Sequence, residues 1–178
     1  MLGEEGYNTM SEYNIGFSEK LLDAARAVAK DGLDSVDAIR TVLYLSSLAS
    51  EIALKALLEK AGKPIKDIKA RRHSLSGLLV DLGGCQIQDE VVKGSLSWVP
   101  ATRVRSVTVD QRFPDATVGK LLTGEEQGAS KYPNELRYGE HVKDYPPDLK
   151  LKAARALVDW GHKHWDQIRL ASASPRSR

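Results

Sequence analysis

The sequence predicts an all-α fold, an up-and-down bundle of four to five helices with a long irregular insertion before the last helix. Two observations carry this prediction: an apolar helical stretch from Asp34 to Gly62, and an apolar seam along the final helix. In the first stretch, nonpolar residues cover most of the helix surface. Between positions 41 and 59, charge is confined to Glu51, Lys55 and Glu59, which follow one another at four-residue spacing. A helix this apolar is surrounded by other helices on most sides, so we expect it at the centre of the bundle.

Both ends of this central helix carry recognisable signals. Asp34 or Ser35 can serve as N-cap, because a short polar side chain there accepts a hydrogen bond from the first free backbone N–H groups. Gly62 supplies the left-handed conformation that ends a helix, and Pro64 prevents its continuation. The helix therefore spans roughly 26 residues, or about 40 Å.

Three further helical stretches precede the insertion. Ser18 is expected to cap a helix that ends near Gly32, and residues 73–84 predict a short helix opened by a His-Ser pair and stopped by two glycines. Residues 88–99 repeat apolar side chains at helical spacing until Pro100, so we expect a helix there as well.

The final helix begins at Pro146-Pro147 and is expected to run to about Arg169. Its apolar residues fall alternately three and four positions apart, which is the spacing of a packing seam. Such a seam packs into the bundle or against a second copy of the chain. The seam consists of Leu151, Ala154, Val158, Gly161, Trp165 and Ile168.

Residues 101–147 lack strong periodicity and are rich in glycine and proline. A connection this long inside a compact domain is either functional or mobile. Its best-defined part contains Tyr132, Arg137, Tyr138 and His141, which could read a base or a nucleotide by stacking. In the alternative interpretation, the two tyrosines pin the loop onto the bundle.

Composition narrows the class of protein. The chain has 178 residues, which favours one domain: a frayed segment 1–16, a bundle 17–170 and a disordered tail 171–178. A single cysteine excludes an intramolecular disulfide and suggests a reducing compartment, so we expect a cytoplasmic protein. No apolar run reaches the length of a membrane span. The four histidines and one cysteine show no zinc spacing, and we expect neither a metal nor a cofactor.

The net charge of +2 is too small to indicate a nucleic-acid-binding protein by itself. A local basic cluster nevertheless follows the central helix, and it could contact phosphates or could simply be a solvated connector. Its members are Lys60, Lys63, Lys66, Lys69, Arg71 and Arg72.

The central helix and the short helix after it together resemble the core of the HEPN superfamily. These are small α-helical domains of prokaryotic nucleotidyltransferase-linked, toxin–antitoxin and antiviral systems. The resemblance covers residues 18–170, and the Arg137-Tyr138 pair before the final helix is similar to an Arg-Tyr pair placed alike in many members. The residues that match the family pattern are Glu51, Leu54, Lys55, Leu57, Leu58, Gly62, His73, Leu75 and Leu78.

The resemblance implies a helical bundle that is frequently a dimer. Catalytic members are metal-independent ribonucleases that carry an arginine and a histidine, with four to six residues between them, on the last long helix. Arg155 and His162 fit this spacing, with six residues between them. The arginine would stabilise phosphate charge, and the histidine would act as acid or base. Alternatively, Arg155 forms an ion pair with Asp159 one turn away.

Two functions follow as predictions. The first is a HEPN-like module without catalysis that binds RNA, a nucleotide or a partner protein in a defence or toxin–antitoxin setting, with a nucleotidyltransferase or defence protein as the possible partner and a homodimer as the expected assembly. The second is a HEPN ribonuclease that uses Arg155 and His162 across a dimer. The residues expected to bind a ligand are Glu51, Lys55, Lys69, Arg71, Arg72, His73, Arg137 and Tyr138.

Overall fold

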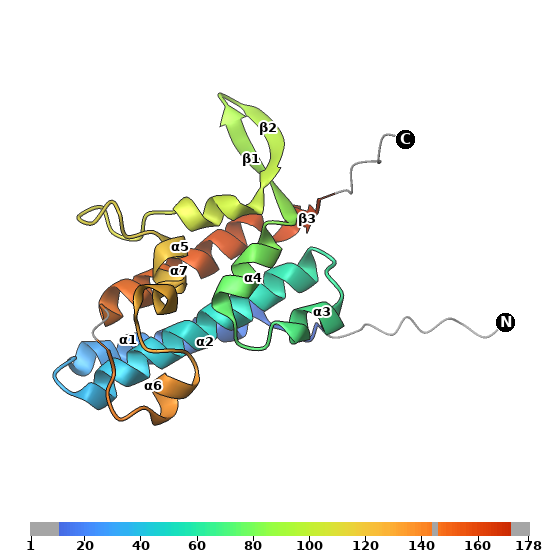
Figure 1. Ribbon diagram of the computed structural model, residues 1–178. Coiled ribbons are helices and arrows are strands. Elements are labelled where there is room, and N and C mark those ends of the chain that lie inside the picture. The colour runs from blue at the N-terminus through green and yellow to red at the C-terminus, as the bar shows by residue number, and fades with distance from the viewer. Residues whose placement is uncertain (1–10, 144–145, 172–178) are drawn as a thin grey trace.

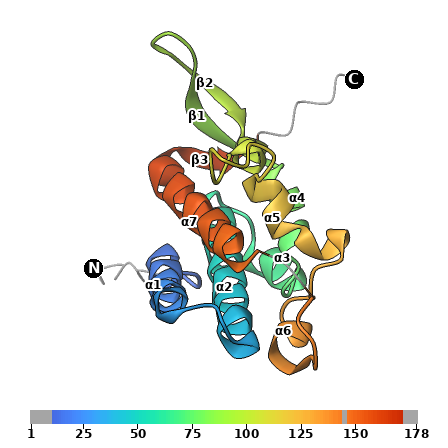
Figure 2. The same ribbon diagram turned by 90° about the vertical axis from the view of Figure 1, so that its left-hand side faces the viewer.

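The computed structural model describes residues 11–143 and 146–171, and it is mostly helical with a small three-stranded antiparallel sheet at one end (Figures 1 and 2). The expectation of a purely all-α fold is therefore wrong. The long helix α2 (Val36–Lys60) lies at the centre, and α1 (Ile15–Asp31), α4 (Leu75–Leu82) and α7 (Pro147–His164) all pack against it.

The central helix forms as predicted. The Ser35 side chain accepts a hydrogen bond from the Ala38 amide at 3.0 Å, which caps the first turn. At the other end Gly62 adopts a left-handed φ of 97°, and the Lys63 amide donates back to the Leu58 carbonyl. These contacts satisfy backbone groups that a helix end would otherwise leave unpaired.

The length and composition of α2 also match those of a membrane-spanning helix, and it is the one such helix in the described part of the chain. However, 72% of its most apolar stretch is buried inside the structure. Leu54, Leu57 and Leu58 have no exposed surface and form the middle of the core. This burial is that of a core helix, which fits a soluble protein.

The start of α1 differs from the prediction. Asn14, and not Ser18, caps this helix, because the Asn14 side chain accepts a hydrogen bond from the Gly16 amide at 2.8 Å. Ser18 lies inside the helix and is fully buried. The preceding residues from position 11 onward are held by Glu59, whose carboxylate accepts hydrogen bonds from the amides of residues 12 and 13 at 2.9 Å each.

Residues 88–99 form strands and not the predicted helix. β1 (Cys85–Val92) pairs with β2 (Ser95–Pro100) as an antiparallel hairpin, which projects from the helical body in Figure 1. The turn is Lys93-Gly94, and the glycine has a φ of 76°, a conformation that glycine adopts without steric cost. Most of the apolar residues at helical spacing are valines, and β-branched residues such as valine favour strands.

The final helix is shorter than predicted. It ends at His164 instead of Arg169, and a 3₁₀ turn leads into β3 (Ile168–Leu170), which pairs with the other side of β1. The apolar seam packs into the bundle against α1 and α2. At Gly161 this packing is so close that an added Cβ would lie 2.8 Å from the Ile15 side chain.

The long insertion folds into short elements. Helix η1 (Ala101–Ser106) follows the hairpin, residues Thr108 and Thr117 form an isolated β-bridge, and α5 (Val118–Leu122) packs against α7. Helices η2 (Gly124–Gln127) and α6 (Asn134–Tyr138) complete it. The basic connector contains a further helix, α3 (Ile65–Ala70), which the sequence did not predict.

Candidate functional site

The site is built on a buried ion pair in the middle of α2. The Lys55 ammonium donates to Oε1 of Glu51 at 2.7 Å, and both side chains are less than 10% exposed. The ammonium also lies 5.4 Å from the centre of the Tyr13 ring, in a cation–π contact. Two of the three charges on the charged stripe of the helix are therefore inside the fold, where an unpaired charge would be strongly unfavourable.

The second carboxylate oxygen of Glu51 is contacted by two residues from distant segments of the chain. The Tyr132 hydroxyl donates to Oε2 at 2.7 Å, and Nδ1 of His73 lies 3.0 Å from the same atom. An ionised carboxylate only accepts, so Nδ1 of His73 carries a proton. One buried carboxylate thus joins α2, the start of α4 and the insertion.

Two pKa shifts follow from this arrangement. Burial alone would raise the pKa of Glu51, but the hydrogen bonds from Lys55, Tyr132 and His73 outweigh it and lower the pKa below its usual 4.5. Burial first, and then the Glu51 carboxylate, raise the pKa of Tyr132. Glu51 is therefore held as an acceptor and Tyr132 as a donor at neutral pH.

A row of ring contacts extends from this carboxylate to the surface. The His73 and Tyr132 rings meet edge to face with centres 6.1 Å apart, and the Tyr132 and Tyr44 rings lie 5.7 Å apart. The Arg137 guanidinium lies 5.0 Å from the Tyr44 ring centre, and its Nε donates to the Tyr44 hydroxyl at 2.8 Å. Tyr138 follows, and it is 78% exposed. We call these five residues the aromatic strip.

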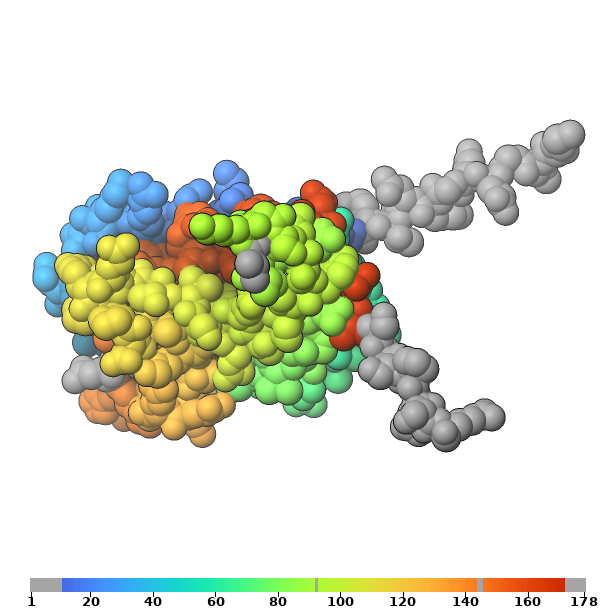
Figure 3. Space-filling view, turned by 90° about the horizontal axis from the view of Figure 1, so that it is seen from above, coloured from blue at the N-terminus to red at the C-terminus, as the bar shows by residue number. Residues whose placement is uncertain are grey.

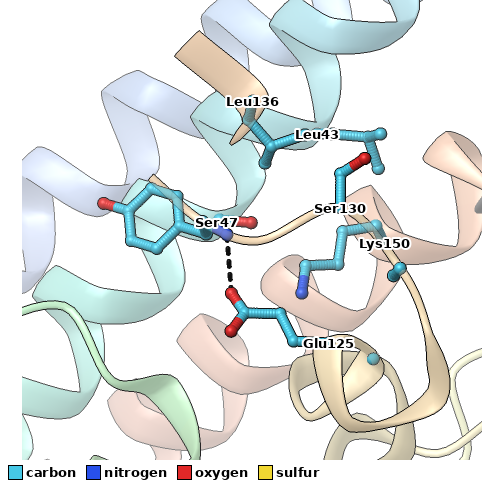
Figure 4. A pocket seen from close by; sticks show the side chains of 9 residues that line it. Leu43, Ser47, Glu125, Ser130, Leu136 and Lys150 are labelled. Atoms are coloured by element: carbon cyan, nitrogen blue, oxygen red, sulfur yellow. Dashed lines mark hydrogen bonds between the residues drawn. The ribbon is translucent and has the colours of Figure 1, made fainter. Parts of the chain in front are cut away.

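Tyr132 is held in place from behind as well. Its amide donates to Glu125 at 2.6 Å, and a small cavity of about 20 Å³ lies between this loop and α7 (Figure 4). The buried Lys150 ammonium reaches this cavity and donates to the Leu121 carbonyl at 2.8 Å. Burial lowers the pKa of Lys150 to about 8, against the opposing charge of Glu125. The cavity has room for one water molecule, so this region positions the strip and does not itself admit a ligand.

The basic connector beside the strip is largely occupied by ion pairs. Lys69 pairs with Glu12 at 2.8 Å, and Arg71 binds both carboxylate oxygens of Asp81. Arg72 is exposed, and it has a positive φ of 49° directly before His73. Arg72 is therefore the exposed cation of the connector that lies next to the strip.

Arg155 and His162 lie elsewhere, on the side of α7 that faces α1. The Arg155 guanidinium contacts Asp23 at 3.3 Å, and Nε2 of His162 lies 3.1 Å from Glu19. The partner of Arg155 is thus a residue of α1 and not Asp159 of its own helix. Among the described residues, the carboxylates that these two side chains contact belong to α1 and not to the aromatic strip.

The sequence predicted most of the residues that meet here but not the contacts that join them. Glu51, Lys55 and His73 gather around one carboxylate, and Arg137 reaches them through Tyr44. Tyr44 was not predicted, although it lies seven residues before Glu51 and so shares its face of α2. Among the described residues, no three histidine, cysteine or acidic side chains are close enough together to hold a metal ion.

Comparison of the chain with models of protein families, with curated proteins and with solved structures finds no match.

We predict that Glu51→Gln destabilises the protein, because Gln cannot neutralise the buried Lys55 ammonium. Breaking a buried ion pair costs about 3 kcal/mol or more, so chemical denaturation at pH 7 should show a loss of about that size. The control Glu126→Gln, at an exposed position, should change stability by less than about 0.5 kcal/mol.

The pH dependence gives an independent check. Because folding lowers the pKa of Glu51, the carboxylate stabilises the fold above pH 4.5, and this contribution is lost as the pH falls through the folded-state value. The difference between wild type and Glu51→Gln should therefore shrink below pH 4.5. A difference that stays constant from pH 7 to pH 3 would contradict the assignment.

Proposed function

We propose that the protein is a HEPN-like helical domain that binds single-stranded RNA through the aromatic strip. The main observation that supports this proposal is the continuous row of contacts from the buried Glu51 carboxylate through Tyr132 and Tyr44 to Arg137. This row fixes a cation and aromatic surfaces at the edge of the molecule before any ligand arrives. Preorganisation reduces the entropy that binding would otherwise cost.

The chemistry of the strip suits an unpaired nucleotide. A base stacks on an exposed aromatic ring with about 1–3 kcal/mol per base, and Tyr138 offers such a ring. Arg137 is permanently charged and presents donors to a phosphate. His73 and Arg72 at the other end of the strip extend the same combination of ring and positive charge.

The convergence of these residues also supports the HEPN resemblance. Glu51, His73 and Arg137 are far apart in the chain, yet they belong to one connected set of contacts. Residues that carry a family pattern through a shared structural role are expected to meet in this way. The accompanying proposals are a prokaryotic defence or toxin–antitoxin setting, a cytoplasmic location, a homodimer, and a nucleotidyltransferase or defence protein as partner.

RNA affinity tests this proposal directly. In a fluorescence anisotropy titration with a labelled single-stranded RNA of mixed sequence, Tyr138→Ala should weaken binding about tenfold through lost stacking. Arg137→Gln should also weaken binding and lower the salt dependence by about one charge. Phe113→Ala and Arg112→Gln are matched controls, because both side chains are exposed but lie on a different loop.

Both controls should bind RNA as the wild type does. Wild-type affinity in Tyr138→Ala and in Arg137→Gln would overturn the proposal, and so would a wild-type protein that does not bind RNA.

A second function, metal-independent RNA cleavage, is favoured by one observation about α7. Arg155 and His162 lie two turns apart on the same side of this helix and are both partly exposed. Their contacts with the carboxylates of α1 are exposed, and such contacts contribute little to stability, so a phosphate could displace either carboxylate. A second copy of the chain would have to complete the site.

Cleavage of labelled RNA in the presence of EDTA distinguishes the two functions. If the protein is a nuclease, Arg155→Ala and His162→Ala should each abolish cleavage while circular dichroism shows intact folding. Arg112→Ala removes another exposed, ion-paired arginine and should cleave normally. Cleavage that is absent in the wild type, or equal in all variants, would remove Arg155 and His162 as catalytic residues.

A further inference from the structure

A groove of about 380 Å³ runs between α1, α7 and the loop 107–117. Figure 3 shows α7 lying open between the N-terminal helix and this loop. The volume of the groove falls within the range of small-molecule sites in proteins. The apolar lining consists of Leu22, Val109, Leu151 and Ala156, contributed by all three walls.

The walls of the groove are already in place. In the loop, the Val109 amide donates to the Ala116 carbonyl at 3.0 Å, which closes it as a narrow antiparallel turn. The loop is tied to α7 because the Lys152 ammonium contacts the Asp110 carboxylate at 2.5 Å. Arg112 binds the same carboxylate, and its hydrogen bond, followed by that of Lys152, holds the pKa of Asp110 well below its usual range.

The rim of the groove is mainly positive. Arg26, Lys152 and Arg155 line it, together with one acidic residue, Asp159. Arg26 has no ion pair with any residue among those described. Arg155 contacts Asp23 through a single nitrogen, at 3.3 Å, whereas a guanidinium has five N–H donors. Positive charge with unused donors therefore surrounds an apolar floor.

We propose that this groove binds a small organic anion with an apolar body, of the carboxylate class. The apolar floor would receive the body of the ligand, and Arg26 and Arg155 would receive the carboxylate. Each feature alone is common on protein surfaces, but the two together match a ligand that carries both. This site shares no residue with the aromatic strip, so it stands or falls independently of RNA binding.

Three probes separate the contributions of charge and apolar surface. They are 1-naphthoate, its uncharged analogue 1-naphthalenemethanol, and acetate, which has the charge without the apolar body. In amide-resolved NMR titrations, 1-naphthoate should shift the signals of residues 22–26, 109 and 151–159 with saturation. The alcohol should bind about tenfold more weakly, because it loses a charge-assisted hydrogen bond. Acetate should not saturate in the same concentration range.

Two variants test the site from opposite directions. Arg26→Gln removes the charge at an exposed position and should weaken 1-naphthoate binding about tenfold. Ala156→Leu fills the apolar floor and should reduce binding of 1-naphthoate and of the alcohol alike. Lys20→Gln, an exposed cation on the same helix outside the groove, is the control and should bind as the wild type does.

The proposal is wrong if 1-naphthoate causes no saturable shift, or if its shifts map to another surface. It is also wrong if Arg26→Gln and Ala156→Leu, with unchanged thermal melting, bind the probe as tightly as the wild type. Line broadening of the groove signals on increasing protein concentration without any ligand would instead identify a second copy of the chain as the occupant.

Discussion

The carboxylate of Glu51 is the constraint on which the site depends. It is buried on the central helix, where an ionised group is stable only if every nearby donor is directed at it. Lys55, His73 and Tyr132 supply those donors, and they come from three different segments of the chain. The carboxylate therefore fixes where α4 begins and where the insertion crosses α2. Three hydrogen bonds to one charged group, two of them buried, also make this region more rigid than a purely apolar contact of the same size.

The buried Glu51 carboxylate also determines how the aromatic strip is arranged at the surface. Tyr132 is mostly buried, yet it sets the position of Tyr44, and Tyr44 in turn holds Arg137 at the edge of the molecule. A loop of Gly- and Pro-rich sequence would ordinarily be too variable to present a defined binding surface. Here its tyrosine is anchored from two sides, by Glu51 in front and by Glu125 behind. The interpretation that the tyrosines pin the loop onto the bundle therefore holds for Tyr132 and not for Tyr138, which remains exposed.

Much of the fold could be predicted where the signals are local. The limits of α2 follow from Ser35 and Gly62, and those of α4 from Ser74 and the glycines after it. The hairpin was missed because its valines also fit helical spacing, although the Lys93-Gly94 turn was a usable signal. The early end of α7 could not be read from the chain, because Ile168 leaves the helix to pair with Ile87, about eighty positions away. For the same reason the sequence named Glu51, His73 and Arg137 but could not show that Tyr132 and Tyr44 connect them.

A double-mutant cycle between Glu51→Gln and Tyr132→Phe is the most direct test of this account. The four proteins should be measured twice, once for the free energy of unfolding and once for RNA affinity. If the buried carboxylate organises the strip through the Tyr132 hydroxyl, the two substitutions should be coupled by about 1 kcal/mol or more in stability. Both substitutions should also weaken RNA binding, although both residues are buried. Additive effects within about 0.5 kcal/mol, with wild-type RNA affinity in all four proteins, would contradict it.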